Sequence, residues 1–443
     1  MRLAKSALIS LMFYSLLSGC VAVPVATDET GPQASPSRAD EPADARELKQ
    51  RADFAGVEFE QQGQLLPASA MQNMVNQLAR QFNVDTPLHF HVMRDASINA
   101  FAMPNGHIYL NVGLLAKLEN QAQVAFVMAH EAAHVIQQHS LHAHLDRKRS
   151  SVGSQIASVL SGGLISGEAI IFMRAARYSR EQELDADAVG LALYRRAGFS
   201  TLNIERVFEL FQETNVQESE QDSTYASHPN NAIRRDAIHK LLSDSDSNKA
   251  RPARMSDQVV VEAAIEAGNL RIVERHYHLA LSAIRRAQAI YPDNAELNFL
   301  EAECLRLMAL YPGNAAQEYV WLNFVFQPFD ADTDSEPDQT KLYQHNKAEQ
   351  QRFEDEVHKQ ALLFEQKSRQ HAALARVIYE EILDSHPDHA KAHRGLAYVA
   401  MQAGDKIATR QHFNDYLMST EHKRDERFIE HLLDSIQQAE EWE

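Results

Sequence analysis

The sequence predicts a mainly α protein with a small β-sheet, followed by a second region that is all α. Three observations carry this prediction. An apolar helix contains the segment His130-Glu131-Ala132-Ala133-His134. Two short stretches on either side of Pro104-Asn105-Gly106 have the composition of strands. Beyond residue 258, helical patterns separated by short turns occupy the rest of the 443 residues, which is enough chain for two cores.

Composition divides the chain into five parts, and we expect a first folded domain and a helical domain joined by a linker. The boundaries are residues 1–19 for a lipoprotein signal peptide, 20–50 for a flexible tether, 51–243 for the first domain, 244–258 for the linker and 259–443 for the helical domain. The formal net charge of −18 disfavours nucleic acid as a partner, because phosphate binding needs a basic surface.

The N-terminus predicts export and lipidation. Arg2 and Lys5 precede an apolar stretch at residues 7–17, which is shorter than the roughly 20 residues of a membrane-spanning helix. Leu17-Ser18-Gly19-Cys20 then resembles a bacterial lipoprotein signal, so Cys20 becomes the lipidated first residue. Because no Asp follows Cys20, we expect attachment to the outer membrane, facing the periplasm. The alternative is a simple cleaved signal or anchor.

The first domain opens with an amphipathic helix expected at residues 68–82 and a strand at 88–92. Residues 98–113 predict two short strands around the Pro-Asn-Gly turn. A helix follows, with Asn120 as a plausible N-cap.

This helix carries a pair of metal-ligand candidates. His130 and His134 are four residues apart, so both imidazoles project from one helical face and can bind one metal ion. Glu131 lies beside that face, where its carboxylate can take a proton from an attacking water. The apolar residues before the motif favour a buried helix that carries a site over a chance match on the surface.

A catalytic zinc site needs a third protein ligand, and a downstream helix offers acidic candidates. Ser179 and Gln182 have the spacing of a capping box, which begins a helix there. Glu183 and Asp187 then share a face, so one can bind the metal while the other orients a ligand. Spacing alone does not distinguish Glu183 from its neighbours Glu181 and Asp185.

The two motifs together, His-Glu-x-x-His and Ser-Arg-x-x-Glu-x-x-Ala-Asp, resemble the HtpX and CAAX-prenyl-endopeptidase family of zinc metalloproteases. The resemblance implies a zincin-type domain that hydrolyses peptide bonds with one Zn²⁺ per chain. It also implies that Glu183 is the third ligand and that Asp187 supports the zinc-binding histidines. The structural alternative is a histidine-rich helix with a coincidental carboxylate.

Two further segments fit the same family. In similar enzymes the hairpin lies beside the zinc and its edge strand pairs with substrate, which makes Asn99, Ala100 and Phe101 candidate substrate contacts. Phe101 has the alternative of being a core residue.

Ser227-His228-Pro229 resembles the family's Ser/Thr-His-Pro motif, with Arg234 six residues after the histidine. His228 and Arg234 are therefore candidates for stabilising the oxyanion. His228 alternatively blocks the zinc at rest or only caps a helix, and Arg234 alternatively only pairs with an acidic side chain.

Three further features lie in the first domain. Residues 152–173 are apolar and rich in glycine, and either form a mobile lid or membrane-touching loop or pack in the core. His139 follows the zinc helix near basic residues and is assigned to a solvated polar end, without a function. His89 and His91 alternate in the strand and also receive no function.

The all-α region predicts partner binding. Helix-Pro-Asp-helix patterns around Pro292 and Pro387 resemble tetratricopeptide repeats, interrupted by an acidic insert at 330–338 and a charged helix at about 341–367. Such repeats present a groove to proteins, unless they only cover the enzyme. A peptidase followed by such repeats resembles envelope proteases that assist β-barrel assembly, which implies misfolded outer-membrane proteins as substrates and the outer-membrane assembly machinery as a partner. The alternative function is an assembly chaperone or adaptor whose proteolysis is latent.

Overall fold

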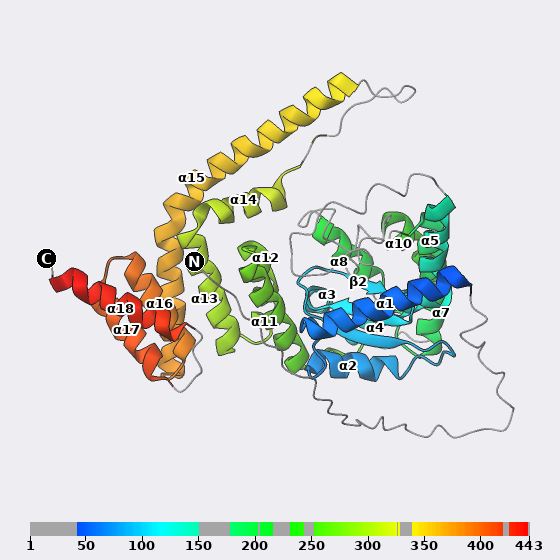
Figure 1. Cartoon of the computed structure of the whole chain (residues 1–443), viewed down its shortest axis with the longest axis horizontal. Helices are drawn as coiled ribbons and strands as arrows, with labels where there is room; N and C mark the ends of the chain where they lie inside the picture. The colour runs from blue at the N-terminus through cyan, green and yellow to red at the C-terminus, as the bar shows by residue number, and fades with distance from the viewer. Residues whose placement is uncertain are drawn as a thin grey trace, which may run out of the picture. The chain divides into compact units, whose positions relative to one another are not determined.

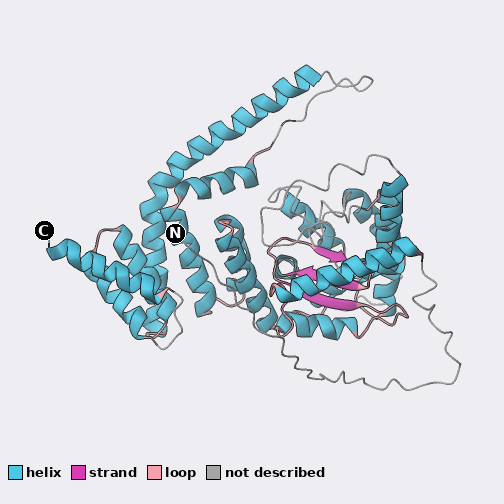
Figure 2. Ribbon diagram, viewed as in Figure 1, coloured by secondary structure: helices cyan, strands magenta, loops and turns pink. Residues whose placement is uncertain are grey.

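The computed structural model describes residues 42–149, 178–202, 204–215, 231–242, 252–325, 327, 339–419 and 425–441 (Figures 1 and 2). Within these ranges the chain is mainly helical with one three-stranded sheet, so the predicted fold class is confirmed. Cys20, the segment 152–173, His228 and the acidic insert at 330–338 lie outside the described residues. No helix in the described ranges is long and apolar enough to cross a membrane.

The strands of the sheet and the helices of the first part come first in the chain. In order they are α1 (Ala43–Gln61), α2 (Ala70–Ala79), β1 (His89–Met93), β2 (Ala100–Ala102), β3 (His107–Asn111), α3 (Val112–Lys117), α4 (Gln121–Ile136), α5 (His139–Arg149), α7 (Arg180–Arg196), α8 (Glu205–Asn215) and α10 (Asn231–Leu241).

The elements of the second part are all helices. They are α11 (Asp257–Val273), α12 (Tyr277–Gln288), α13 (Ala295–Leu310), α14 (Pro312–Asn323), α15 (Gln339–Ser385), α16 (Ala390–Gln402), α17 (Lys406–Met418) and α18 (Glu426–Glu441).

The sheet has the strand order β1-β3-β2, with β3 parallel to β1 and antiparallel to β2. The hairpin expected around Pro104-Asn105-Gly106 is thus present, and β2 lies at one edge (Figure 2). Gly106 adopts φ +90° in the turn, a backbone conformation that favours glycine.

Helix α4 is the centre of the first core. Every residue from Ala122 to His134 is buried, because the helix packs against β2, α2 and α7. Asn120 caps it as expected, with its side-chain oxygen accepting from Gln123 N at 3.0 Å. A helix buried on all sides presents its polar motif to the interior, where few water molecules compete for it.

Two helix boundaries differ from the prediction. Helix α2 spans ten residues instead of the expected 68–82, because Ser69 caps its start by accepting from Gln72 N. The expected tether ends before residue 50, because α1 begins at Ala43. Ala45, Leu48, Ala52, Ala55 and Phe59 form the buried face of α1. Because this face is rich in alanine, which is only weakly apolar, the helical period of the apolar residues is difficult to recognise in an otherwise polar sequence.

The second part has its own apolar core, built mainly from α12, α13, α15 and α16. Pro292 and Pro387 lie in the turns before α13 and α16, as predicted. The charged helix expected at about 341–367 continues without a break into the next helical stretch, so α15 has 47 residues (Figure 1). Helix α11 carries residues of both cores, with Ala263 in the first and Ala264 in the second.

Candidate metal centre

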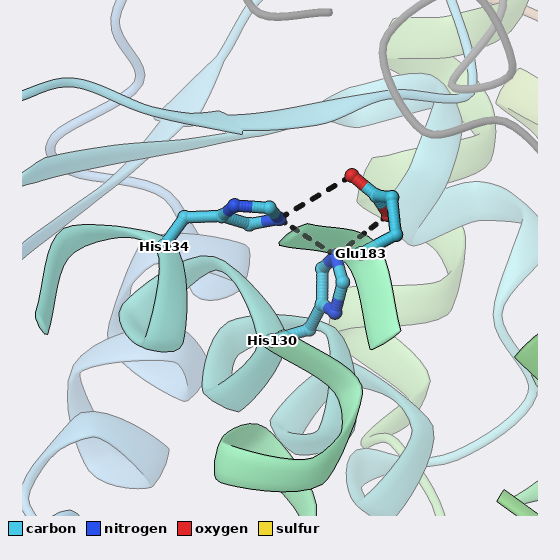
Figure 3. Close-up of side chains that lie close together, drawn as sticks. All are labelled: His130, His134 and Glu183. Atoms are coloured by element: carbon cyan, nitrogen blue, oxygen red, sulfur yellow. Dashed lines mark hydrogen bonds and ion pairs between the residues drawn. The ribbon is translucent and has the colours of Figure 1, made fainter. Parts of the chain in front are cut away.

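Three buried side chains from two helices converge on one point (Figure 3). His130 and His134 come from α4, and Glu183 comes from α7. The Nε2 atoms of the two histidines are 3.1 Å apart. Each lies 3.6 Å from one oxygen of the Glu183 carboxylate. The side chains predicted to bind metal are therefore adjacent.

The spacing of these atoms fits a zinc ion. Zinc binds imidazole nitrogen and carboxylate oxygen at about 2.0 to 2.2 Å in tetrahedral geometry, which separates neighbouring ligand atoms by about 3.4 Å. The observed separations of 3.1 and 3.6 Å bracket that value. Two imidazoles and one carboxylate are also a donor set of catalytic zinc sites, which keep a fourth position open.

Local sequence explains why α7 presents Glu183. The capping box is present: Ser179 Oγ accepts from Gln182 N, and the Gln182 side chain accepts from Ser179 N. Helix α7 therefore begins where predicted and directs Glu183 inward, with an exposed fraction of zero. The side chains of Glu181 and Asp185 are 72% and 44% exposed. Burial thus distinguishes Glu183 from the neighbours that spacing had left open.

Gly190 allows α7 to lie close to α4. A β-carbon at this position would be 3.0 Å from His130 Cα and 3.1 Å from the Ala129 carbonyl oxygen. Any larger residue would therefore push against the backbone of the helix that carries His130 and His134. The absence of a side chain at Gly190 brings the carboxylate of one helix within reach of the histidines of the other.

Asp187 lies behind His130, one helical turn after Glu183. Its Oδ1 is 3.0 Å from His130 Nδ1, so the ring can donate through Nδ1 and keep the Nε2 lone pair for a metal. Burial opposes the charge of Asp187, but Arg234 outweighs this effect and holds the pKa of that carboxyl well below its usual range. Asp187 is thus a charged acceptor in the position that the prediction gave it.

Arg234 comes from α10 and is 5% exposed. Its Nε and Nη2 atoms donate to the two oxygens of Asp187 at 2.8 and 2.7 Å, and its Nη1 lies 2.8 Å from Glu183 Oε2. These contacts agree with the second interpretation of Arg234, pairing with acidic side chains. The single positive charge of the guanidinium offsets part of the negative charge of the two buried carboxylates and so lowers the cost of placing them together.

His139 approaches the second histidine of the motif, and its assignment to a solvated end was wrong. It is 4% exposed, its Nδ1 lies 2.9 Å from His134 Nδ1, and its Nε2 lies 3.3 Å from Asp185 Oδ2. Gln138 adopts φ +52° and turns the chain so that His139 returns to α4. Sequence alone gives no signal for a left-handed glutamine.

Burial sets the protonation of His139, and its two contacts decide which ring nitrogen carries the proton. Burial lowers the pKa of this imidazole, although Asp185 opposes the shift, so the ring is neutral near pH 7. A neutral ring that donates from Nε2 to Asp185 accepts at Nδ1 from His134. His134 then keeps its Nε2 lone pair for the metal. Tyr178, which no sequence pattern singled out, stacks its ring on His134 with the two ring centroids 3.8 Å apart.

Comparison with known proteins agrees with this arrangement. The sequence model of peptidase family M48 matches residues 65–242. The chain contains a peptidase M48 domain. It is similar to the beta-barrel assembly-enhancing protease of Escherichia coli K12, with 32% identity over 26% of each chain. It is similar to metalloprotease LoiP of the same organism, with 25% identity over 44% of this chain and 81% of LoiP. It is also similar to mitochondrial metalloendopeptidase OMA1 of Schizosaccharomyces pombe, with 28% identity over 36% of this chain and 48% of OMA1. The chain covers less than a third of the assembly-enhancing proteases.

Glu131 and an apolar pocket lie beside the candidate metal ligands of the M48 domain. Glu131 is 1% exposed and, with His130, contributes to the wall of the pocket. The other lining residues are mostly apolar: Ala100, Leu114, Phe126, Val127, Val207, Phe208 and Phe211, with Arg234. A carboxylate and an imidazole at the edge of an apolar pocket form a site that can hold an apolar side chain next to the reacting groups.

The edge strand of the M48 domain passes the same pocket. Ala100, in β2, contributes to the pocket lining, and Asn99 O accepts from Asn111 N at 3.0 Å. Phe101 points into a separate apolar cluster and stacks on Tyr109, in agreement with its interpretation as a core residue. Among the described residues β2 pairs only with β3 and so forms an edge of the sheet, where its residues Ala100, Phe101 and Ala102 are 1%, 2% and 6% exposed.

Proposed function

We propose that the chain is a zinc-dependent endopeptidase of the bacterial cell envelope. The observation that carries the proposal is the convergence of His130, His134 and Glu183 with separations that fit zinc, in a chain with an M48 domain. In this proposal the three side chains hold the metal and Glu131 is the general base. When bound, zinc acts as a Lewis acid that polarises the scissile carbonyl and makes water more acidic.

Each step left to the protein has a candidate group. Glu131 takes a proton from the attacking water and passes it to the amide nitrogen of the leaving peptide. The backbone of β2 aligns an extended substrate by adding a strand, and the adjacent pocket holds an apolar side chain. Asp187 and Arg234 position His130 and Glu183, and His228 is the remaining candidate for oxyanion stabilisation or for blocking the site.

The N-terminal signal and the names of the relatives support a cell location and partners for this enzyme. The signal ending in Cys20 favours a lipid-anchored periplasmic enzyme on the outer membrane, and relatives are named beta-barrel assembly-enhancing proteases. The helical part, which we interpret as tetratricopeptide-like, then binds misfolded outer-membrane proteins or their assembly machinery. Replacing Cys20 by Ala should move the protein from the outer-membrane fraction to the soluble periplasm; unchanged fractionation would contradict lipid anchoring.

A variant at the general base tests the enzymatic proposal. Glu131→Gln should retain about one zinc per chain at the M48 centre and lose casein cleavage by about 10² to 10⁴-fold. The matched control is Glu181→Gln, which changes an exposed carboxylate of α7 and should leave both properties intact. Chelation should stop cleavage in the wild type, and added zinc should restore it. Cleavage that survives Glu131→Gln would contradict the proposal.

Exposed apolar side chains on α15 support a second candidate function, that of an assembly adaptor. Leu363, Leu374 and Val377 are 40%, 46% and 49% exposed and occupy nearby angular positions on α15. Apolar groups gathered on one helical face are typical of protein-binding surfaces. Replacing Leu374 and Val377 by Ser should impair barrel assembly in cells without changing casein cleavage, if binding through the helices is a separate activity.

A further inference from the structure

A second group of side chains of the types that bind metals lies in the helical part of the chain, outside the M48 domain. His393 comes from α16, and His412 and Asp415 come from α17. One ligand atom from each of the three lies within 4.8 Å of the others. The Nδ1 atoms of the histidines are 3.3 Å apart, and His393 Nδ1 is 3.7 Å from Asp415 Oδ2.

The helix pair explains this convergence. His412 and Asp415 are three residues apart on α17, which places them on one face. Helices α16 and α17 are joined by a short turn in which Gly404 adopts φ +77°. The two helices pack closely, so the third side chain meets the first two without a long loop. The position of all three groups thus depends on regular helical structure.

The hydrogen bond of His393 Nε2 determines which nitrogen of this ring is available to a metal. Nε2 lies 3.0 Å from the carbonyl oxygen of Pro387, which can only accept, so Nε2 carries the proton. The Nδ1 lone pair then faces His412 and Asp415. Metal-binding histidines commonly donate their other N–H to a carbonyl or carboxylate in this way.

The cluster borders α15, because Arg376 and Glu380 of that helix lie close enough to act on the charge of His412. Arg376 pairs with Glu380 at 2.7 Å, so both charges lie on the α15 side of the cluster. The side chains of His393 and Asp415 are 16% and 38% exposed, which leaves a route from solvent.

We propose that His393, His412 and Asp415 form a second site for a divalent transition-metal ion such as Zn²⁺, which joins α16 to α17. The separations of 3.3 and 3.7 Å are close to the roughly 3.4 Å between ligands of a tetrahedral zinc ion. Two imidazoles and one carboxylate select zinc or its transition-metal neighbours over calcium and magnesium, which prefer oxygen ligands. A metal that binds the folded helices and not the unfolded chain stabilises them.

Zinc stoichiometry in the full mature chain tests this proposal. Equilibrium dialysis against ZnCl₂ should give about two zinc ions per wild-type chain, one for each three-ligand set. His393→Gln and His412→Gln should each bind one, with casein cleavage unchanged. The matched control is His358→Gln, which replaces an exposed histidine of α15 and should bind two.

A second background separates this site from the M48 centre. His134→Ala removes an M48 ligand, so it should bind one zinc, and His134→Ala with His412→Gln should bind none. In the His134→Ala background, ZnCl₂ should raise the unfolding temperature, and His412→Gln should abolish that shift. Retention of the second zinc in His412→Gln, or an equal loss in His358→Gln, would overturn the proposal. Circular dichroism confirms that each variant is folded.

Discussion

Arg234 and Asp187 form a buried two-point ion pair, with Nε and Nη2 of the guanidinium 2.8 and 2.7 Å from the two carboxylate oxygens. Asp187 in turn contacts His130 Nδ1 at 3.0 Å. A residue of α10 thereby orients a side chain of α4 that is 104 positions earlier in the chain. The candidate metal centre thus depends on an element that supplies none of its three candidate ligands.

Replacing Arg234 by Met should weaken zinc binding. The change leaves Asp187 and Glu183 buried without their shared cation, which costs about 3 to 5 kcal/mol of stability when one partner of a buried pair is lost. We also expect zinc affinity to fall about 10 to 100-fold, because the contacts that orient the ligands are lost. Zinc titration and urea unfolding measure the two effects.

The neighbouring Arg235 supplies the control for this variant. Its side chain is 37% exposed, so Arg235→Met should change stability and zinc affinity little. If Arg234→Met keeps wild-type zinc affinity and loses only kcat, the guanidinium acts on the oxyanion and not on the ligands.

Replacing His139 by Phe should also lower zinc affinity, by about 10 to 100-fold. His134 then loses the acceptor that fixes its Nδ1 proton, while the apolar ring still fills the buried space. His142→Phe is the matched control, because that histidine lies exposed on the same helix. Equal zinc affinities in the two variants would show that the contact between His139 and His134 has no effect on the site.

The histidines of β1 and β3 should make stability depend on pH. Burial and the nearby His107 and His89 lower the pKa of His91 to about 4, whereas an imidazole in the unfolded chain titrates near 6.5. The unfolded state therefore binds more protons between these values. This contribution to stability is complete above about pH 6.5 and is lost as pH falls towards 4.

His91→Gln tests the pH dependence. Between pH 7 and pH 5 the wild type should lose about 1 kcal/mol more stability than the variant, a value reduced from the full shift because His91 is partly exposed. His358→Gln should lose as much as the wild type. Parallel pH profiles for wild type and His91→Gln would mean that His91 is not titrating with a lowered pKa.

Gly395→Ala should destabilise the helical part. A β-carbon at Gly395 would lie 2.3 Å from the ring of Tyr379, which is fully buried and hydrogen-bonded to Glu303. Because the ring has no room to move, we expect a loss of about 1 to 3 kcal/mol from overpacking. Urea unfolding followed by circular dichroism provides the measurement.

Gly313→Ala is the control for the glycine variant, because a β-carbon there meets no atom within 4 Å. Alanine also favours the helix in which it lies, so this change should be neutral or slightly stabilising. An equal stability for the two variants would contradict the close packing of Gly395 on Tyr379.

Local rules were sufficient to predict the elements that carry the candidate ligands, whereas the choice of Glu183 among the acidic residues of its helix came from the family resemblance. The period of the α-helix placed His130 and His134 on one face, and the Ser179 capping box set the start of the helix that carries Glu183. The hairpin followed from a turn signal between two short strands. Each of these features depends on residues within a few positions of one another, so the amino-acid sequence determines them without knowledge of the fold.

Only the tertiary structure decided which side chains surround the ligands. Burial distinguished Glu183 from Glu181 and Asp185, and the left-handed Gln138 brought His139 back to His134. Arg234 and the pair of His393 with His412 come from helices whose contacts depend on packing. These contacts join residues that are distant in the chain, or residues that a turn not predicted from the sequence brings together. The periodicity of apolar residues within one helix carries no information about which other helix packs against it.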